Sequence, residues 1–165
     1  MAKVMKTKNI WSVLCKKALV DSQTQLVSII DIVEKLILEI DITKAPKEIQ
    51  ESFKDGVLEN PIQLSDTLTV ASYWAIGEDS RERDMTLETL IKDSNGKTLL
   101  TGSMQVKFDS ANSSHRTFVN LPSFPITGSG TYKIRSLLKD KKGKIITKGE
   151  TQIEIELKNV SKAQS

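Results

Sequence analysis

Apolar and polar residues alternate with a period of two in three segments of the second half of this sequence. The pattern covers residues 100–108, 131–139 and 151–158. In the middle segment Tyr132, Ile134 and Leu138 fall on one side of an extended chain, and Lys133 and Lys139 fall on the other. Because successive side chains of a β-strand point to opposite faces of a sheet, this alternation predicts half-buried strands with one face in water.

Turn-forming residues separate the alternating segments at short intervals. Asn95-Gly96 lies between two such runs, which is a strong hairpin signal, and Lys142-Gly143 lies between two more. Several short strands with this spacing predict an all-β sandwich or barrel.

The first third of the chain supports two interpretations. Between residues 26 and 40 apolar side chains recur at helical spacing, and Ser22 with Gln25 is able to form a capping box. However, six of the residues from 27 to 37 are β-branched, which suits a strand. Further on, residues 46–55 predict one short connecting helix, with Pro46 in its first turn and Gly56 as its stop.

Residues 14–36 resemble the opening of a family of small uncharacterised bacterial proteins. That opening runs Leu-Cys-Asp-x-Ala-x-Val-Asp, a polar turn, and then Lys-Leu-Ser-Ile-Ile-Gly-Ile-Phe-Asp. The matching residues are Leu14, Cys15, Ala18, Val20, Asp21, Leu26, Ser28, Ile29, Ile30 and Ile32. The departures are Lys16 for the acid, Asp31 for the glycine and Val33 for the aromatic residue. In such proteins the segment looks like two strands joined by the turn. The resemblance therefore implies that residues 26–33 form a strand, which continues imperfectly towards residue 41.

Residues 130–157 resemble the last two strands of bacterial immunoglobulin-like domains. Those strands often read Gly-x-Tyr, alternating residues, Asp-x-x-Gly and a final alternating strand. The resemblance implies an immunoglobulin-like, two-sheet antiparallel β-sandwich. In such folds a tyrosine packs at the sandwich corner with its hydroxyl bonded back to the backbone, and Tyr132 is the candidate for this role. We expect Trp74, together with Val70 and Ile76, in the core of a central strand.

A chain of 165 residues fits a single domain with a sizeable core. We expect residues 9–158 to form it, with flexible segments at 1–8 and 159–165. No run approaches the roughly 20 apolar residues of a membrane span, and no export signal is recognisable at the N-terminus. Cys15 is the only cysteine, which excludes an internal disulfide and fits a reducing cytoplasm.

Two segments invite a phosphate or nucleic-acid interpretation, and both are better explained by the fold. Gly128 and Gly130 precede an alternating strand, whereas a phosphate-binding loop requires a helix at that point. The lysines between 139 and 144 fall on a predicted hairpin tip, and only Tyr132 is near enough to stack on a base. With a net charge of only +3, the sequence argues against a nucleic-acid partner.

The residue types needed for common catalytic and metal sites are scarce. His115 is the only histidine, so a site with several histidines is excluded. Cys15 lies beside Val13 and Leu14, which favours a small buried hydrophobic residue over a nucleophile. Paired carboxylates leave a hydrolase as the least favoured hypothesis. We therefore predict a protein that is not an enzyme and that uses no cofactor and no metal.

The leading hypothesis is a non-catalytic intracellular interaction domain that binds a protein partner, or a second copy of itself, through an edge strand or end loops. The predicted binding residues are Tyr73, Glu78, Asp79, Arg81 and Arg83. The alternative is a small-ligand or carbohydrate-binding module that uses the loops around residues 77–84 and 109–117. Trp11 and Trp74 are more often core residues than a ligand platform, but either one, if exposed beside Tyr73, would favour a sugar or peptide groove.

Overall fold

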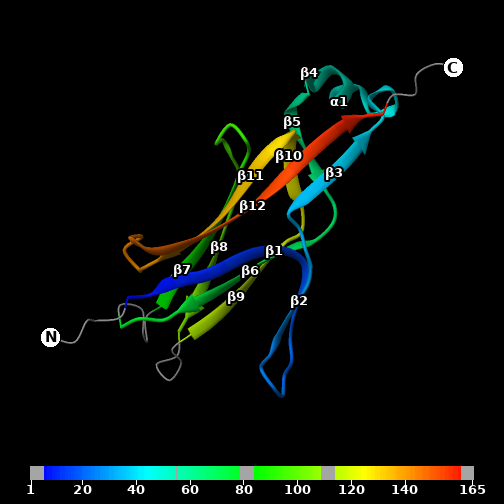
Figure 1. Ribbon diagram of the computed structural model, residues 1–165. Coiled ribbons are helices and arrows are strands. Elements are labelled where there is room, and N and C mark those ends of the chain that lie inside the picture. The colour runs from blue at the N-terminus through cyan, green and yellow to red at the C-terminus, as the bar shows by residue number, and fades with distance from the viewer. Residues whose placement is uncertain (1–5, 55, 79–83, 109–113, 161–165) are drawn as a thin grey trace.

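The computed structural model describes residues 6–54, 56–78, 84–108 and 114–160, most of which belong to β-strands (Figure 1). Sheet A has the strand order β2-β1-β6-β9. Its members are β1 (Lys8–Val20), β2 (Val27–Ile32), β6 (Leu68–Ala75) and β9 (Ser114–Leu121). All three pairings within sheet A are antiparallel.

Sheet B has five strands in the order β3-β12-β11-β7-β8. They are β3 (Lys35–Ile40), β7 (Asp84–Lys92), β8 (Thr98–Lys107), β11 (Gly130–Lys139) and β12 (Ile145–Asn159). A small sheet C, in the order β10-β5-β4, closes one side. It is made of β4 (Phe53–Lys54), β5 (Val57–Leu64) and β10 (Phe124–Gly128).

Sheets A and B pack face to face around two apolar clusters. In the larger cluster Leu14 and Val70 of sheet A meet Ile134 and Ile153 of sheet B, and Phe124 of sheet C joins them. The second cluster lies around Trp74 and contains Leu87, Phe108 and Leu138, among others. The predicted all-β sandwich is therefore confirmed, and the alternation in β11 and β12 is the inward–outward pattern of strands with one face in this core.

The two predicted hairpins are confirmed. The N–H of Asp93 donates to the carbonyl of Lys97 across the turn that joins β7 and β8, and Gly96 in that turn has φ +81°. The N–H of Asp140 likewise donates to the carbonyl of Lys144 between β11 and β12. The positive φ at the glycine is the conformation that this residue adopts without steric cost.

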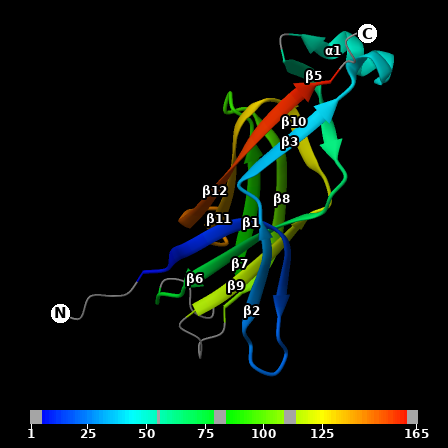
Figure 2. The same cartoon turned by 45° about the vertical axis from the view of Figure 1, so that its right-hand side comes forward.

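The predicted short helix near residues 46–55 is also confirmed. It is α1 (Lys47–Ser52), which follows the 3₁₀ turn η1 (Ile42–Lys44) and leads into β4. Figures 1 and 2 show it at one end of the sandwich, where it connects β3 to sheet C. Within the described ranges no helix is long and apolar enough to cross a membrane.

Residues 26–41 form strands, as the family resemblance implied, but not one continuing strand. β2 pairs with β1 in sheet A, whereas β3 pairs in parallel with β12 in sheet B, so the sandwich is not wholly antiparallel. The chain changes sheets at Val33, whose N–H donates to Leu14, and at Glu34, whose carbonyl accepts the N–H of Glu154. Neither the helical spacing nor the β-branched residues of this segment mark the break.

Candidate interaction site

Tyr132 lies in the core as a corner residue, with none of its surface exposed. Its hydroxyl accepts the N–H of Thr127 at 2.9 Å and the N–H of Gly128 at 3.1 Å, and it donates to the carbonyl of Gly128 at 2.9 Å. These contacts join the start of β11 to the end of β10. Trp74 is equally buried, and its indole N–H donates to the Thr117 hydroxyl at 2.9 Å.

Cys15 and His115 do not form a catalytic pair. Cys15 is buried, its Sγ donates to the carbonyl of Thr69 at 3.4 Å, and burial raises the pKa of its thiol. Burial also lowers the pKa of His115, whose ring contacts Phe108 edge-on with centroids 4.8 Å apart. Cys15 pairs with Thr69, whereas His115 pairs with Trp74. Those rows of sheet A are five residues apart, which is roughly 16 Å along the strands.

The predicted binding residues do not all fall within the described part of the chain. Asp79, Arg81 and Arg83 lie outside it. Glu78 is exposed in the turn that follows β6. Tyr73 is half-buried on β6 and belongs to a cluster that composition and spacing do not reveal.

That cluster is a stack of Trp11, Tyr73 and Arg116 on neighbouring strands β1, β6 and β9. The register of sheet A pairs Trp11 with Tyr73 and Tyr73 with Arg116. The two rings stack with centroids 5.8 Å apart and an interplanar angle of 30°. The guanidinium carbon of Arg116 lies 5.6 Å from the Tyr73 centroid, which is a cation–π distance. Trp11 and Tyr73 are both half-buried, and Tyr73 has the Trp11 ring and the Arg116 guanidinium as neighbours.

Arg116 connects this stack to the tip of the β1–β2 hairpin. Its Nη1 donates to the carbonyl of Gln25 at 3.0 Å. The tip itself is ordered by Asp21, whose Oδ1 accepts the N–H groups of Gln23 and Thr24 and the Thr24 hydroxyl. These bonds hold the pKa of Asp21 below its ordinary value. Ser22 and Gln25 therefore belong to a hairpin turn and not to a helix cap.

The hairpin presents apolar side chains to solvent, as it projects from the end of sheet A (Figures 1 and 2). Leu26 is 66% exposed, Ile30 40% and Ile32 57%. Ser28, Ile30 and Ile32 occupy alternate positions along β2 and pair with Leu19, Lys17 and Cys15, which alternate along β1, and Leu26 comes one residue before β2. Leu19 of β1 pairs with Ser28 and is also exposed, which extends the same surface.

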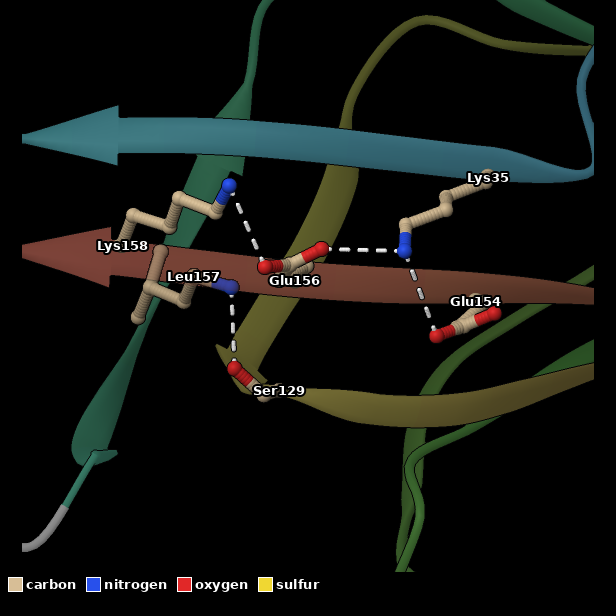
Figure 3. A network of polar contacts seen from close by, with 6 residues as sticks. All are labelled: Lys35, Ser129, Glu154, Glu156, Leu157 and Lys158. Carbon is tan, nitrogen blue, oxygen red and sulfur yellow. Dashed lines mark hydrogen bonds and ion pairs between the residues drawn. The ribbon is translucent and has the colours of Figure 1, made fainter.

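The free edge of β2 differs from the edge of β3, which charged side chains cover. Lys35 Nζ lies 2.9 Å from Glu156 Oε2 and 3.5 Å from Glu154 Oε1, and Lys158 Nζ lies 3.3 Å from Glu156 Oε1 (Figure 3). The hydrogen bond from Lys35 holds the pKa of Glu156 below its ordinary range. Charged side chains of this kind discourage pairing with another chain. β2 carries an apolar row instead.

A pocket of about 460 Å³ lies between the hairpin and β9. Its lining residues are Val20, Gln25, Ser114, His115, Arg116 and Phe118. A second cavity, of about 530 Å³, opens where β1 approaches β11 and β12, and Thr131, Thr151 and Gln152 are among its lining residues. Among the described residues no group of three or more His, Cys, Asp or Glu side chains converges as a metal site requires.

Three solved structures are similar to part of this chain. Neither a protein-family match nor a curated relative is found. A beta-glucuronidase from glycoside hydrolase family 2 is 20% identical, with a TM-score of 0.41 over 62% of this chain and 11% of that chain. A beta-glucuronidase of Bacteroides uniformis is 12% identical, with a TM-score of 0.44 over 59% and 12%. A putative beta-galactosidase from Bacteroides fragilis is 18% identical, with a TM-score of 0.41 over 59% and 15%. The chain thus spans a small part of each enzyme, and this level of likeness carries no functional conclusion.

Proposed function

We propose that this protein is a non-catalytic interaction module that binds an extended strand of a partner protein along the free edge of β2. The observation that carries the proposal is a set of exposed apolar side chains at an edge strand, Ile30 and Ile32 on β2 and Leu26 one residue before it. In strand addition the main chain of the edge supplies hydrogen bonds, and alternate side chains supply specificity.

The free energy of burying these three side chains supports binding at the β2 edge. Fully burying an isoleucine or leucine contributes about 1.5–3 kcal/mol, so covering three side chains that are roughly half exposed contributes about 3 kcal/mol. Main-chain hydrogen bonds add to this. The Arg116–Gln25 contact and the Asp21 turn hold the hairpin before a partner arrives, which reduces the entropy lost on binding.

Selection of displayed random peptides on sparsely immobilised protein tests the proposal. Enriched peptides should shift the NMR signals of residues 26–32, and Ile30→Lys should abolish their binding. Ile37→Lys is the matched control, because Ile37 is a comparably exposed isoleucine (51%) on the charged β3 edge. Peptides that bind Ile30→Lys unchanged, or that shift other residues, contradict the β2 site.

A second candidate function is small-ligand or carbohydrate binding in the 460 Å³ pocket beside β9. The observation that favours it is that Ser114, His115 and Arg116, which belong to the predicted 109–117 region, line this pocket together with Phe118. A polar rim over an apolar surface suits a sugar. Ligand-observed NMR with a panel of mono- and oligosaccharides tests it: a binder lost in Phe118→Ala supports the pocket, and a panel without any binder rejects it.

A further inference from the structure

We infer that the strand bound along β2 is β2 of a second copy of this chain, paired antiparallel about a two-fold axis at Ile29. This inference rests on the proposed use of the β2 edge and names its partner. It makes sheet A continuous across two subunits, with eight strands in the pair.

The position of the axis follows from the alternation of β2. Residues that face each other across antiparallel strands lie on the same face of the sheet, so a two-fold pairing must join positions of equal parity. With the axis at Ile29, the whole exposed stretch from Leu26 to Ile32 pairs with itself. An axis at Ile30 would place Leu26, which comes one residue before β2, opposite Glu34, two residues beyond the end of the facing strand.

This register is self-complementary in shape and polarity. Leu26 and Ile32, the two most exposed side chains of the row, lie opposite each other across the interface. The small Ser28 lies opposite the larger Ile30. On the other face Ile29 meets Ile29 of the partner subunit. An isologous interface requires this kind of match, because both subunits contribute the same surface.

Electrostatic repulsion does not oppose the pairing. Asp31 lies opposite Val27 of the partner subunit, so the two Asp31 carboxylates are four residue positions apart, or roughly 13 Å. Lys17 lies on β1, where it pairs with Ile30 of β2. The two Lys17 side chains are therefore separated by three strand spacings, at least about 14 Å. Both distances exceed the Debye length of about 8 Å at physiological ionic strength.

Sedimentation equilibrium of the full chain over a concentration series tests the partner. We expect a monomer–dimer equilibrium whose dissociation constant rises at least tenfold in Ile30→Lys and changes little in Ile37→Lys. A dimer that persists in Ile30→Lys overturns the surface. A monomer at every concentration overturns the second copy as partner. If selected peptides still bind β2 in that case, the proposed function stands; if they do not, both fail.

Disulfide crosslinking tests the register. A mixture of Ser28→Cys and Ile30→Cys chains should form crosslinked dimers faster than either variant alone, because residue 28 faces residue 30 of the partner subunit. The unsubstituted chain is the control, since its single thiol, Cys15, is buried. Faster crosslinking of Ile30→Cys alone would place the axis at Ile30 and overturn the register.

Discussion

Tyr132→Phe removes a single oxygen from the corner of the sandwich, and its cost can be worked from the contacts of that oxygen. The hydroxyl accepts two backbone N–H groups and donates to one carbonyl, at 2.9–3.1 Å, in a site with no exposed surface. Phenylalanine leaves these groups of Thr127 and Gly128 without that partner. A hydrogen bond of this kind contributes about 1 kcal/mol, and an orphaned buried group costs about 1–3 kcal/mol. We therefore expect the free energy of unfolding to fall by about 3 kcal/mol.

Urea denaturation followed by tryptophan fluorescence measures this change. The midpoint should fall while the m-value stays constant, because the surface exposed on unfolding is unchanged. Tyr73→Phe is the matched control: Tyr73 is half-buried, and its hydroxyl has no hydrogen-bond partner among the described residues, so its effect should stay within about 0.5 kcal/mol. A Tyr132→Phe variant that loses less than about 1 kcal/mol would show that the corner hydroxyl does not stabilise the junction of β10 and β11.

Three further outcomes follow from the site and its surroundings. Arg116→Met keeps an apolar stem but removes the cation–π contact with Tyr73 and the hydrogen bond to Gln25. We expect faster amide exchange at the tip of the β1–β2 hairpin and an unfolding free energy that is only about 1 kcal/mol lower. Asp31 has φ +53°, so Asp31→Val should destabilise by about 1–2 kcal/mol whereas Asp31→Gly should not, as thermal melts of the pair would show. Arg135 donates to Glu150 at 2.6 Å and lowers the pKa of the Glu150 carboxyl. The stabilisation from this pair is present above the ordinary glutamate pKa of about 4.3 and is lost as the pH falls through the lowered pKa. Glu150→Gln should therefore flatten the acid limb of a stability–pH curve.

Asp31 has a positive φ one residue before the end of β2. Glycine is the residue that adopts such a backbone conformation without strain, and aspartate tolerates it better than most other residues. The backbone then crosses to sheet B at Val33 and Glu34.

The candidate site was predictable only in part. Tyr73 was expected to bind, and an edge strand was expected to be the interaction surface. Arg116 is not among the residues that the sequence singles out, and Trp11 enters only with Trp74, as a tryptophan that would favour a groove if it were exposed beside Tyr73. Trp11 and Arg116 are 62 and 43 residues away from Tyr73 along the chain. Their proximity comes from the registers of β1, β6 and β9, and one sequence contains no local signal for a register between distant strands.

The sequence by itself determined the alternating strands in the second half of the chain and the turns between them, whereas it left residues 26–40 between helix and strand. Side-chain alternation at Tyr132, Ile134 and Leu138 and the glycines at Gly96 and Gly143 are local properties, set by the two-residue repeat of a strand and by backbone sterics. Only the tertiary structure decided which strands became neighbours and which edges stayed open. The pairing depends on how two sheets cover each other's apolar faces, which is a non-local condition. As a result β3 pairs with β12 and not with β2, and β2 has a free, apolar edge.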